Sequence, residues 1–261
     1  MKNLTKTIHS HCLTMVLPVM ALFIFNASLA SGKPKPKVLL FYKTAGFYHK
    51  SIAVGIRAIQ KMGVDNNFEV DTTLDAKKII TENLKQYKAV IFLSTTGDVL
   101  DDVQQEAFKK YIQAGGGFMG IHAATDCEYN WPWYGNLVGA YFGGHPSQQT
   151  ATLNITDKKN LSTKHLPDPW IRKDEWYSFK WMAEGLNVLI TIDEKSYDLG
   201  KIKPMGHHPM AWYHAYDGGR AFYTELGHTD ESFADPLYLQ HVLQGIGYAM
   251  GLKKQSKLTI R

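Results

Sequence analysis

The segment GGGFMGIHAATD, residues 115–126, carries the pattern that decides the fold. Its apolar residues are typical of a buried strand, and a sharp turn and a short helix are expected after them. In many open α/β sheets such a turn holds a serine or cysteine nucleophile between small residues. Here the corresponding residue is His122, so the turn predicts a polar site with a different chemistry.

Alternating strand and helix patterns surround this segment. Ser51 and Asp101 are expected as helix N-caps, and Gln104 suits a capping box with Asp101. The alternation predicts a doubly wound, mainly parallel α/β sheet with helices on both faces. The expected strands cover residues 37–42, 68–73, 88–94 and 117–122, and the expected helices follow Ser51, lie near residues 81–87 and follow Asp101.

The second half of the sequence is less regular. Asp217, Gly218 and Gly219 predict the turn of a β-hairpin. Asp235 and Pro236 are expected to open a last helix. Further strands are expected at residues 150–156, 170–179 and 187–193 and on both sides of the hairpin turn.

The N-terminus has the pattern of an export signal. A basic start, an apolar run over residues 13–25 and small residues at Ser28 and Ala30 predict a signal peptide, with the mature protein periplasmic or secreted. The apolar run is short for a membrane span, so no stable membrane association is expected after cleavage, although retention as an anchor stays open. The expected organisation is a signal peptide at 1–30, a basic lead-in at 31–37, one domain at 38–252 and a basic tail at 253–261.

Charge and cysteine content restrict the partners. Cleavage removes two lysines and no acid, so the formal net charge falls from +5 to +3, which is too small to favour nucleic acid. Cys12 lies in the expected signal, so Cys127 is the one cysteine left and no disulfide can form within a mature chain. Assembly into a homo-oligomer stays open.

Polar residues follow several of the expected strands. The first strand leads to His49, the third to residues 95–98, and the fourth to His122 and Asp126. Because the carboxyl ends of parallel strands share one edge of a sheet, these residues predict a polar site there.

These strand-end motifs resemble the trehalose-utilisation (ThuA-like) family. The resemblance implies a flavodoxin-like core related to class I glutamine amidotransferases and a role in sugar metabolism, in pathways of 3-keto-glycosides. An amidotransferase of this fold needs a cysteine at the turn held by His122, and Cys127 lies five residues further, so glutamine hydrolysis is not expected. The matching segments are TAGFYHKS, GGGFMGIHAATD, FGGHP, DEWYSF and HPMAWYHAYDGGRAFYTELGHT.

Four residues are candidates for catalysis. His122 and Asp126 are four residues apart and would meet if a helix begins there, so that the carboxylate fixes the imidazole tautomer. The alternative is a buried histidine that Asp126 satisfies structurally. Glu175 is the expected general acid/base because a neighbouring aromatic ring can raise its pKa. His228 ends a late strand, as His122 ends an earlier one.

A second set of residues is expected to bind substrate. Aromatic rings cover the apolar faces of sugars, while imidazole and guanidinium groups bind their oxygens. Arg220 could instead be a surface residue of the hairpin, and His214 could instead be a core histidine. Of the adjacent pair His207 and His208, His208 is the preferred candidate for facing the site. The substrate-binding candidates are Tyr48, His49, His145, Trp176, His208 and Arg220.

Metal binding stays open in the sequence. No H-E-x-x-H or paired C-x-x-C spacing is present, so a site for zinc or a similar divalent metal would be assembled from distant loops. The same residues suit metal-free acid–base chemistry. The candidate ligands are His49, His122, Asp126 and His228.

The expected function is that of an exported enzyme whose partner is a small-molecule carbohydrate. It would act on a 3-keto-glycoside or related sugar by acid–base isomerisation or glycoside cleavage. A carbohydrate-binding or sensing domain without turnover is the alternative, and a glutamine amidotransferase comes third.

Overall fold

The computed structural model describes Met1, residues 34–252 and residues 259–260. The chain divides into two units, residues 1–34 and 35–261, and the second contains nearly all of the described residues. The expected signal peptide and most of the expected tail lie outside the described residues. Within the described part, no helix is both long enough and apolar enough to cross a membrane.

A nine-stranded sheet forms the centre of the second unit. Its order is β2-β1-β3-β4-β11-β10-β9-β6-β7. Neighbours among the first five positions pair in parallel, which is the flavodoxin-like order with β11 in the fifth place. The predicted doubly wound α/β fold is therefore confirmed. The strands are β1 (Lys37–Phe41), β2 (Glu69–Thr73), β3 (Ala89–Leu93), β4 (Gly117–Ile121), β6 (Gln149–Ile155), β7 (Trp170–Asp174), β9 (Asn187–Ile192), β10 (Pro209–Tyr216) and β11 (Gly219–Thr224).

The other strands of the sheet pair antiparallel. Strand β5 (Ala140–Gly144) and strand β8 (Ser178–Met182) form a separate two-stranded sheet. The single strand predicted over residues 170–179 is wrong, because β7 ends at Asp174 and β8 begins at Ser178. Glu175 lies on the connection by which the backbone leaves the large sheet for the small one.

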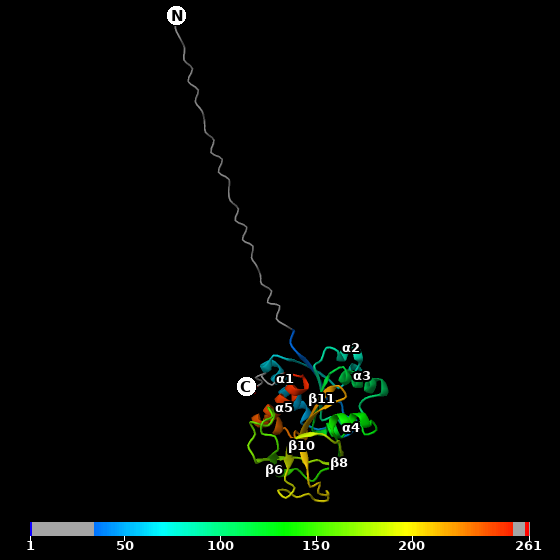
Figure 1. The fold of residues 1–261 in the computed structure, drawn as a ribbon, viewed down its shortest axis with the longest axis vertical. Helices are drawn as coiled ribbons and strands as arrows, with labels where there is room; N and C mark the ends of the chain where they lie inside the picture. The colour runs from blue at the N-terminus through cyan, green and yellow to red at the C-terminus, as the bar shows by residue number, and fades with distance from the viewer. Residues whose placement is uncertain (2–33, 253–258, 261) are drawn as a thin grey trace. The chain divides into compact units, whose positions relative to one another are not determined.

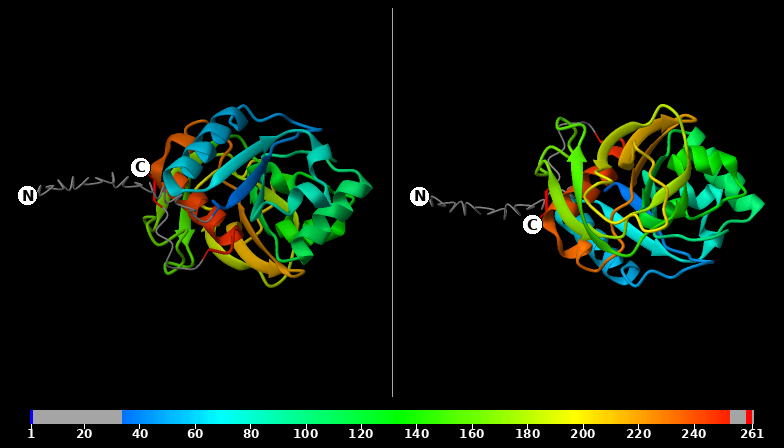
Figure 2. Two further views of the ribbon diagram at one scale, coloured as in Figure 1. Left: turned by 90° about the horizontal axis from the view of Figure 1, so that it is seen from above. Right: turned by 90° about the horizontal axis from the view of Figure 1, so that it is seen from below.

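Helices cover both faces of the parallel strands (Figures 1 and 2). Because the strands are buried on both faces, neighbouring β1 side chains enter different cores: Val38 packs with the α1 and α5 side, and Leu39 packs with the α3 and α4 side. One face carries α1 (Ile52–Asn66) and α5 (Pro236–Ala249), and the other carries α2 (Thr81–Leu84), α3 (Asp102–Gln113) and α4 (Pro132–Val138).

The local signals act as expected with one exception. Asp101 and Gln104 form the capping box at the start of α3, and Asp217 and Gly218 take positive φ values of 45° and 89°, as a type I′ hairpin turn requires. Ser51 precedes α1 but makes no side-chain cap. Its hydroxyl instead donates to the Gly227 carbonyl, 3.1 Å away, which joins the start of α1 to the loop after β11.

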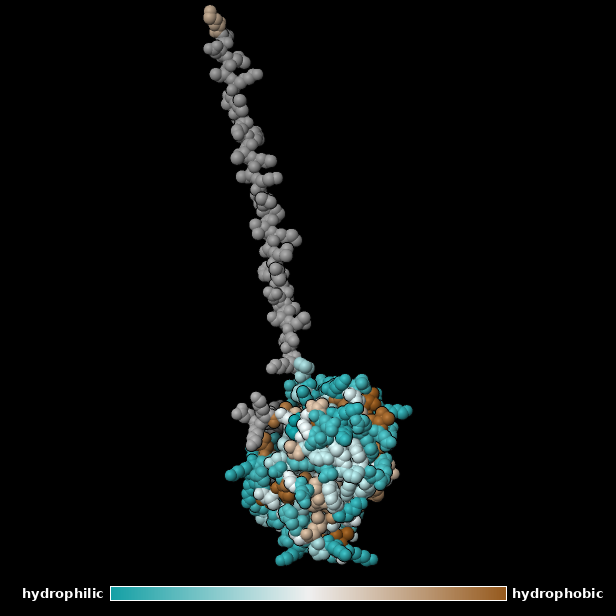
Figure 3. All heavy atoms as spheres, turned by 45° about the vertical axis from the view of Figure 1, so that its right-hand side comes forward, coloured by the Kyte–Doolittle hydropathy of each residue, from teal (hydrophilic) through white to brown (hydrophobic). Residues whose placement is uncertain are grey.

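The surface of the domain in the view of Figure 3 is mostly hydrophilic, with hydrophobic residues scattered over it. Single exposed hydrophobic residues are normal on protein surfaces. Three of the histidines that the sequence singled out, His49, His122 and His228, follow β1, β4 and β11 and lie at the carboxyl edge of the parallel strands.

Candidate functional site

His122 occupies a sharp turn directly after β4. Its backbone φ is +51°, a left-handed conformation that non-glycine residues adopt rarely, and a short 3₁₀ helix over His122–Thr125 follows. The Tyr223 hydroxyl donates to the His122 carbonyl over 2.7 Å and stabilises the turn. The strand-to-turn geometry of a nucleophile elbow is therefore present with an imidazole in place of the nucleophile.

The ring of His122 is fully buried and has a defined tautomer. Its Nδ1 lies 2.7 Å from the Glu225 backbone carbonyl, which can only accept, so Nδ1 carries the proton. The lone pair of a neutral ring is then on Nε2. That atom lies 3.0 Å from His228 Nδ1 and 3.6 Å from Glu175 Oε2.

Glu175 lies between two imidazoles. Its Oε2 is 2.9 Å from His228 Nδ1, and its Oε1 is 3.2 Å from His145 Nδ1. Burial raises the pKa of the carboxyl, but the hydrogen bonds with His122 and His228 outweigh burial and hold the pKa below its ordinary value. The predicted rise in the pKa of Glu175 is therefore corrected, because the neighbours that matter are imidazoles and not an aromatic ring. Glu175 is a carboxylate in the folded protein.

A buried carboxylate holds the His228 loop in place. Asp174 accepts from the backbone N–H groups of Gly227 and His228, each over 3.1 Å, and from the Ser232 hydroxyl over 2.9 Å. Arg172 pairs with it at 3.0 Å. Gly227 has φ +119°, and a Cβ there would lie 2.4 Å from the Tyr238 hydroxyl oxygen, so the loop requires glycine.

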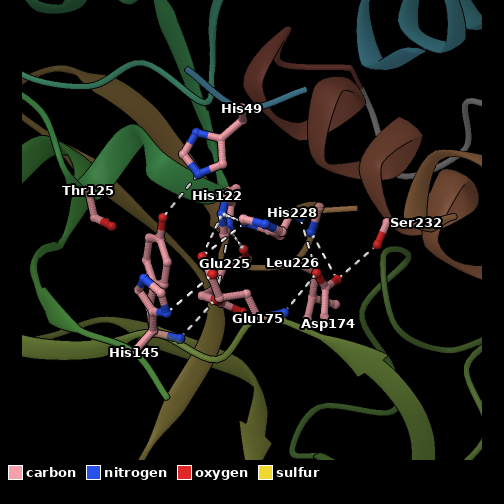
Figure 4. Close-up of polar contacts among 12 residues, drawn as sticks. His49, His122, Thr125, His145, Asp174, Glu175, Glu225, Leu226, His228 and Ser232 are labelled. Carbon is pink, nitrogen blue, oxygen red and sulfur yellow. Dashed lines mark hydrogen bonds and ion pairs between the residues drawn. The ribbon is translucent and has the colours of Figure 1, made fainter. Parts of the chain in front are cut away.

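His49 completes the cluster from the loop between β1 and α1. Its ring is perpendicular to that of His122, with centroids 4.7 Å apart, and its centroid lies 5.1 Å from that of His228. Burial and then the neighbouring His122 and His228 lower the pKa of His49 to about 2, so the ring is neutral. One side-chain atom from each of His49, His122, Glu175 and His228 lies within 4.8 Å of the others. Figure 4 shows these side chains gathered from separate loops.

A cleft of about 560 Å³ opens beside the cluster and gives a ligand access to it. His228 and His49 lie at its wall, and Phe47 and Tyr48 line its edge with 64% and 56% of their surfaces exposed. The His122 side chain has no exposed surface, whereas 15% of the His228 side chain is exposed. His228 is therefore the member of this pair that a ligand in the cleft can touch.

The predicted pairing of His122 with Asp126 does not form. Asp126 accepts a hydrogen bond from the Tyr129 hydroxyl instead. A 3₁₀ turn rather than an α-helix follows His122, and the His122 ring nitrogens face Glu225, His228 and Glu175. Glu175 therefore occupies the position beside the imidazoles that was predicted for Asp126.

Three predicted substrate-binding residues lie away from the cleft. Trp176 is fully buried, and its indole N–H donates to the Gln149 carbonyl. His208 is held behind the site between the Tyr177 carbonyl and Glu194. Arg220 pairs with Gly117 at the amino ends of β11 and β4, which is the opposite edge of the sheet from His122.

Two further candidates have structural surroundings. His214 is buried, and its Nε2 lies 2.9 Å from the Leu137 carbonyl, as in a satisfied core histidine. Cys127 is fully buried, and burial raises its thiol pKa well above the ordinary value. An inert thiol of this kind cannot serve as the nucleophile of an amidotransferase.

Sequence reasoning missed Glu225, which lies directly after β11. Its side chain is fully buried, and its Oε1 accepts from the Tyr177 backbone N–H over 3.0 Å. Burial raises the pKa of Glu225 well above its ordinary value. The signal available was an acid at a strand end, three residues before His228 in the motif TELGH.

Comparison with known proteins agrees with this architecture. A ThuA-like protein from Bacteroides uniformis ATCC 8492 is 23% identical, with a TM-score of 0.72 over 90% of this chain and 98% of that one. A ThuA-like protein from Parabacteroides merdae ATCC 43184 is 20% identical, with a TM-score of 0.68 over 85% and 92% of the two chains. A β-galactosidase from Rahnella sp. R3 is 16% identical, with a TM-score of 0.55 over 84% of this chain and 32% of that one. At these identities the likenesses show the fold alone.

A comparison with curated proteins gives no match. The family described as trehalose utilisation (ThuA) matches residues 37–249, which is nearly the whole described domain. The chain therefore belongs to the ThuA family, whose description places it in carbohydrate metabolism.

Proposed function

We propose that this protein is an exported enzyme that acts on a 3-keto-glycoside or a related oxidised sugar by proton transfer next to the carbonyl group. The observation that carries the proposal is the placement of His145 and His228 on the two oxygens of one carboxylate, Glu175, with His228 lining an open cleft. Export rests on the signal pattern of residues 1–30.

The proposed chemistry needs one base and one acid. A keto group at C3 makes the hydrogen on C2 acidic, so a base can remove it. Loss of the glycosidic oxygen from C1 then forms a C1–C2 double bond, and an acid returns a proton to the departing oxygen. Reprotonation at another carbon gives isomerisation instead. Neither route needs the paired carboxylates of ordinary glycosidases.

The Glu175 carboxylate supports both imidazoles in these roles. His228 turns Nδ1 toward Glu175, which leaves Nε2 as the ring nitrogen for a sugar. The side chain of His145 is 41% exposed, so it can reach the same ligand from the other side of Glu175. An ionised carboxylate at hydrogen-bond distance fixes the orientation and the tautomer of an imidazole. His122 lies beneath this pair and orients His228.

Carbohydrate binding without turnover is the second candidate. It is favoured by the exposed rings of Phe47 and Tyr48 at the edge of the cleft, because flat aromatic rings can cover the apolar face of a sugar. These rings also suit an enzyme, so only turnover separates the two functions.

The test is exchange of the C2 hydrogen of a 3-keto-glucoside for deuterium, followed by NMR in D₂O. The wild type should catalyse exchange, and H228A and E175Q should each lower its rate by about 10²–10⁴-fold, the usual contribution of a general acid or base. H207A is the matched control, because His207 is exposed and separate from the cluster. Unchanged exchange in both variants would contradict the assignment, and tight sugar binding without exchange would support the binding domain.

A further inference from the structure

We propose that His122, His228 and Glu175 bind one divalent transition-metal ion such as Zn²⁺, with the fourth coordination position facing His49. The inference concerns the same site as the proposed function but rests on the arrangement of donor atoms and not on the reaction. Two histidines and one glutamate form a known set of three protein ligands for a catalytic zinc ion that keeps one open position.

The tautomer of His122 is the one that metal binding requires. Metal-bound histidines usually donate their other ring N–H to a carbonyl or carboxylate, which fixes the ring. His122 donates Nδ1–H to the Glu225 carbonyl over 2.7 Å. This contact directs the Nε2 lone pair toward His228 and Glu175.

The spacing of the three donor atoms fits a single ion. His122 Nε2, His228 Nδ1 and Glu175 Oε2 form a triangle with sides of 2.9, 3.0 and 3.6 Å. Ligands on a tetrahedral zinc ion with bonds of about 2.0–2.1 Å lie roughly 3.3 Å apart. Small shifts of the side chains would therefore place one ion at bonding distance from all three atoms.

The supporting residues hold the ligands on separate, fixed segments. Asp174 accepts the His228 backbone N–H, and the Tyr223 hydroxyl fixes the turn at His122. All three ligand side chains are at least largely buried, so a bound ion would be screened little by water. A carboxylate beside two imidazoles also supplies the negative charge that a buried cation needs.

His49 is placed to contact an oxygen bound at the fourth position. Its ring faces His122 and His228, and its Nε2 lies 3.5 Å from the Tyr177 hydroxyl. Its Nδ1 has no hydrogen-bond partner among the described residues, and the hydroxyl beside Nε2 can donate or accept, so the surroundings fix neither tautomer. His49 can therefore hydrogen-bond to a bound water or sugar oxygen in either tautomer.

A bound cation would polarise the carbonyl oxygen of a keto sugar. With His228 and Glu175 as ligands, His145, which is 41% exposed and contacts Glu175 Oε1, is the imidazole that remains to move a proton. The metal site thus reduces the candidates for proton transfer from two imidazoles, His145 and His228, to His145 alone.

The test measures metal binding without any sugar. Metal-stripped protein is titrated with Zn²⁺ against a chromogenic chelator, and the bound metal is counted by elemental analysis. The wild type should bind one ion per chain, and H122A and E175Q should each bind it at least about 100-fold more weakly. Co²⁺ in place of Zn²⁺ should give the visible spectrum of a four-coordinate site.

D126N is the control, because Asp126 is a nearby carboxylate that the structure leaves out of the donor set. Its zinc affinity should equal that of the wild type. Thermal unfolding of the metal-stripped variants establishes that each is folded. Absence of a stoichiometric ion, or equal affinity of E175Q and the wild type, would overturn the inference. Zinc binding without sugar turnover would uphold it and contradict only the proposed reaction.

Discussion

Two sets of buried histidines differ in what surrounds their second ring nitrogen. His208, His214 and His241 each contact a backbone carbonyl, at 2.7, 2.9 and 2.9 Å, and none belongs to a convergent donor cluster. His122 also contacts a carbonyl, but its other nitrogen faces His228 and Glu175. Burial and one hydrogen bond are therefore common to structural and functional histidines, and the difference is the convergence of further lone pairs.

The largest expected effect of this difference is on turnover. H122A should lower C2 exchange by about 10²–10⁴-fold, because His228 and Glu175 lose the group that orients them. H214A should leave turnover within a few-fold of the wild type and lower the free energy of unfolding by about 1–3 kcal/mol, since the Leu137 carbonyl loses its partner. Exchange rates and urea unfolding of both variants measure this contrast. A similar loss of turnover in H122A and H214A would contradict the distinction between functional and structural histidines.

The loop that carries His228 should be less tolerant than a surface turn with the same backbone conformation. G227A places a Cβ 2.4 Å from the Tyr238 hydroxyl oxygen, whereas G185A, also at a positive φ, meets no atom of the described residues within 4 Å. In both variants an alanine must adopt a left-handed backbone conformation, which lowers the free energy of unfolding by about 1–2 kcal/mol. The clash should lower the free energy of unfolding of G227A by roughly 1–2 kcal/mol more. G227A should also lose turnover. Equal free energies of unfolding for the two variants would show that the His228 loop accommodates a Cβ at position 227, and would contradict the expected clash.

Buried neutral histidines should make the folded state sensitive to acid. Burial lowers the pKa of His241 to about 3 from an ordinary 6.5, so between these values the unfolded chain binds a proton that the folded chain does not. Stability therefore rises with pH across this window and is lost as the pH falls. From pH 6.5 to pH 5 the loss through His241 is about 2 kcal/mol.

H241Q should reduce this pH dependence, because glutamine does not titrate. The measurement is the free energy of unfolding of wild type and variant at both pH values. His49 contributes in the same direction in both proteins, so the difference between them isolates His241. Identical slopes for the two proteins would contradict the assignment of a neutral buried His241.

The smallest expected effect lies at the amino edge of the sheet. Arg220 donates to the Gly115 carbonyl over 2.8 Å and to the Ala249 carbonyl over 3.3 Å, which ties the end of α5 to the sheet. R220M should lower the free energy of unfolding by about 1 kcal/mol and leave sugar turnover unchanged. A specific loss of sugar affinity in R220M would contradict this structural role and indicate that Arg220 binds sugar.

Much of the parallel half could be predicted because its signals are local. The apolar run before His122 and the capping box at Asp101 identify their elements without knowledge of the rest of the chain. The rule that parallel strands end at one edge then brings His49 and His122 together. His228 joins them because β11 pairs in parallel with β4.

The rest depends on contacts between distant segments. Spacing favoured Asp126 as the partner of His122, but the positive φ at His122 and the 3₁₀ turn after it direct the ring elsewhere. Glu175 reaches the cluster because the chain changes sheets after Asp174, and no alternation of apolar residues marks that change. Arg220 was placed wrongly because the direction of β11 relative to β4 is not visible in the sequence.

The central claim is that Glu175, and not Asp126, is the carboxylate that joins His122 and His228. Long-range proton–nitrogen NMR spectra of the metal-free protein test it directly, because they report which ring nitrogen of each histidine carries the proton. We predict His122 protonated on Nδ1, with the signals of His122 and His228 changed by E175Q and unchanged by D126N. A His122 protonated on Nε2 alone, or signals that move in D126N and stay in E175Q, would contradict the account.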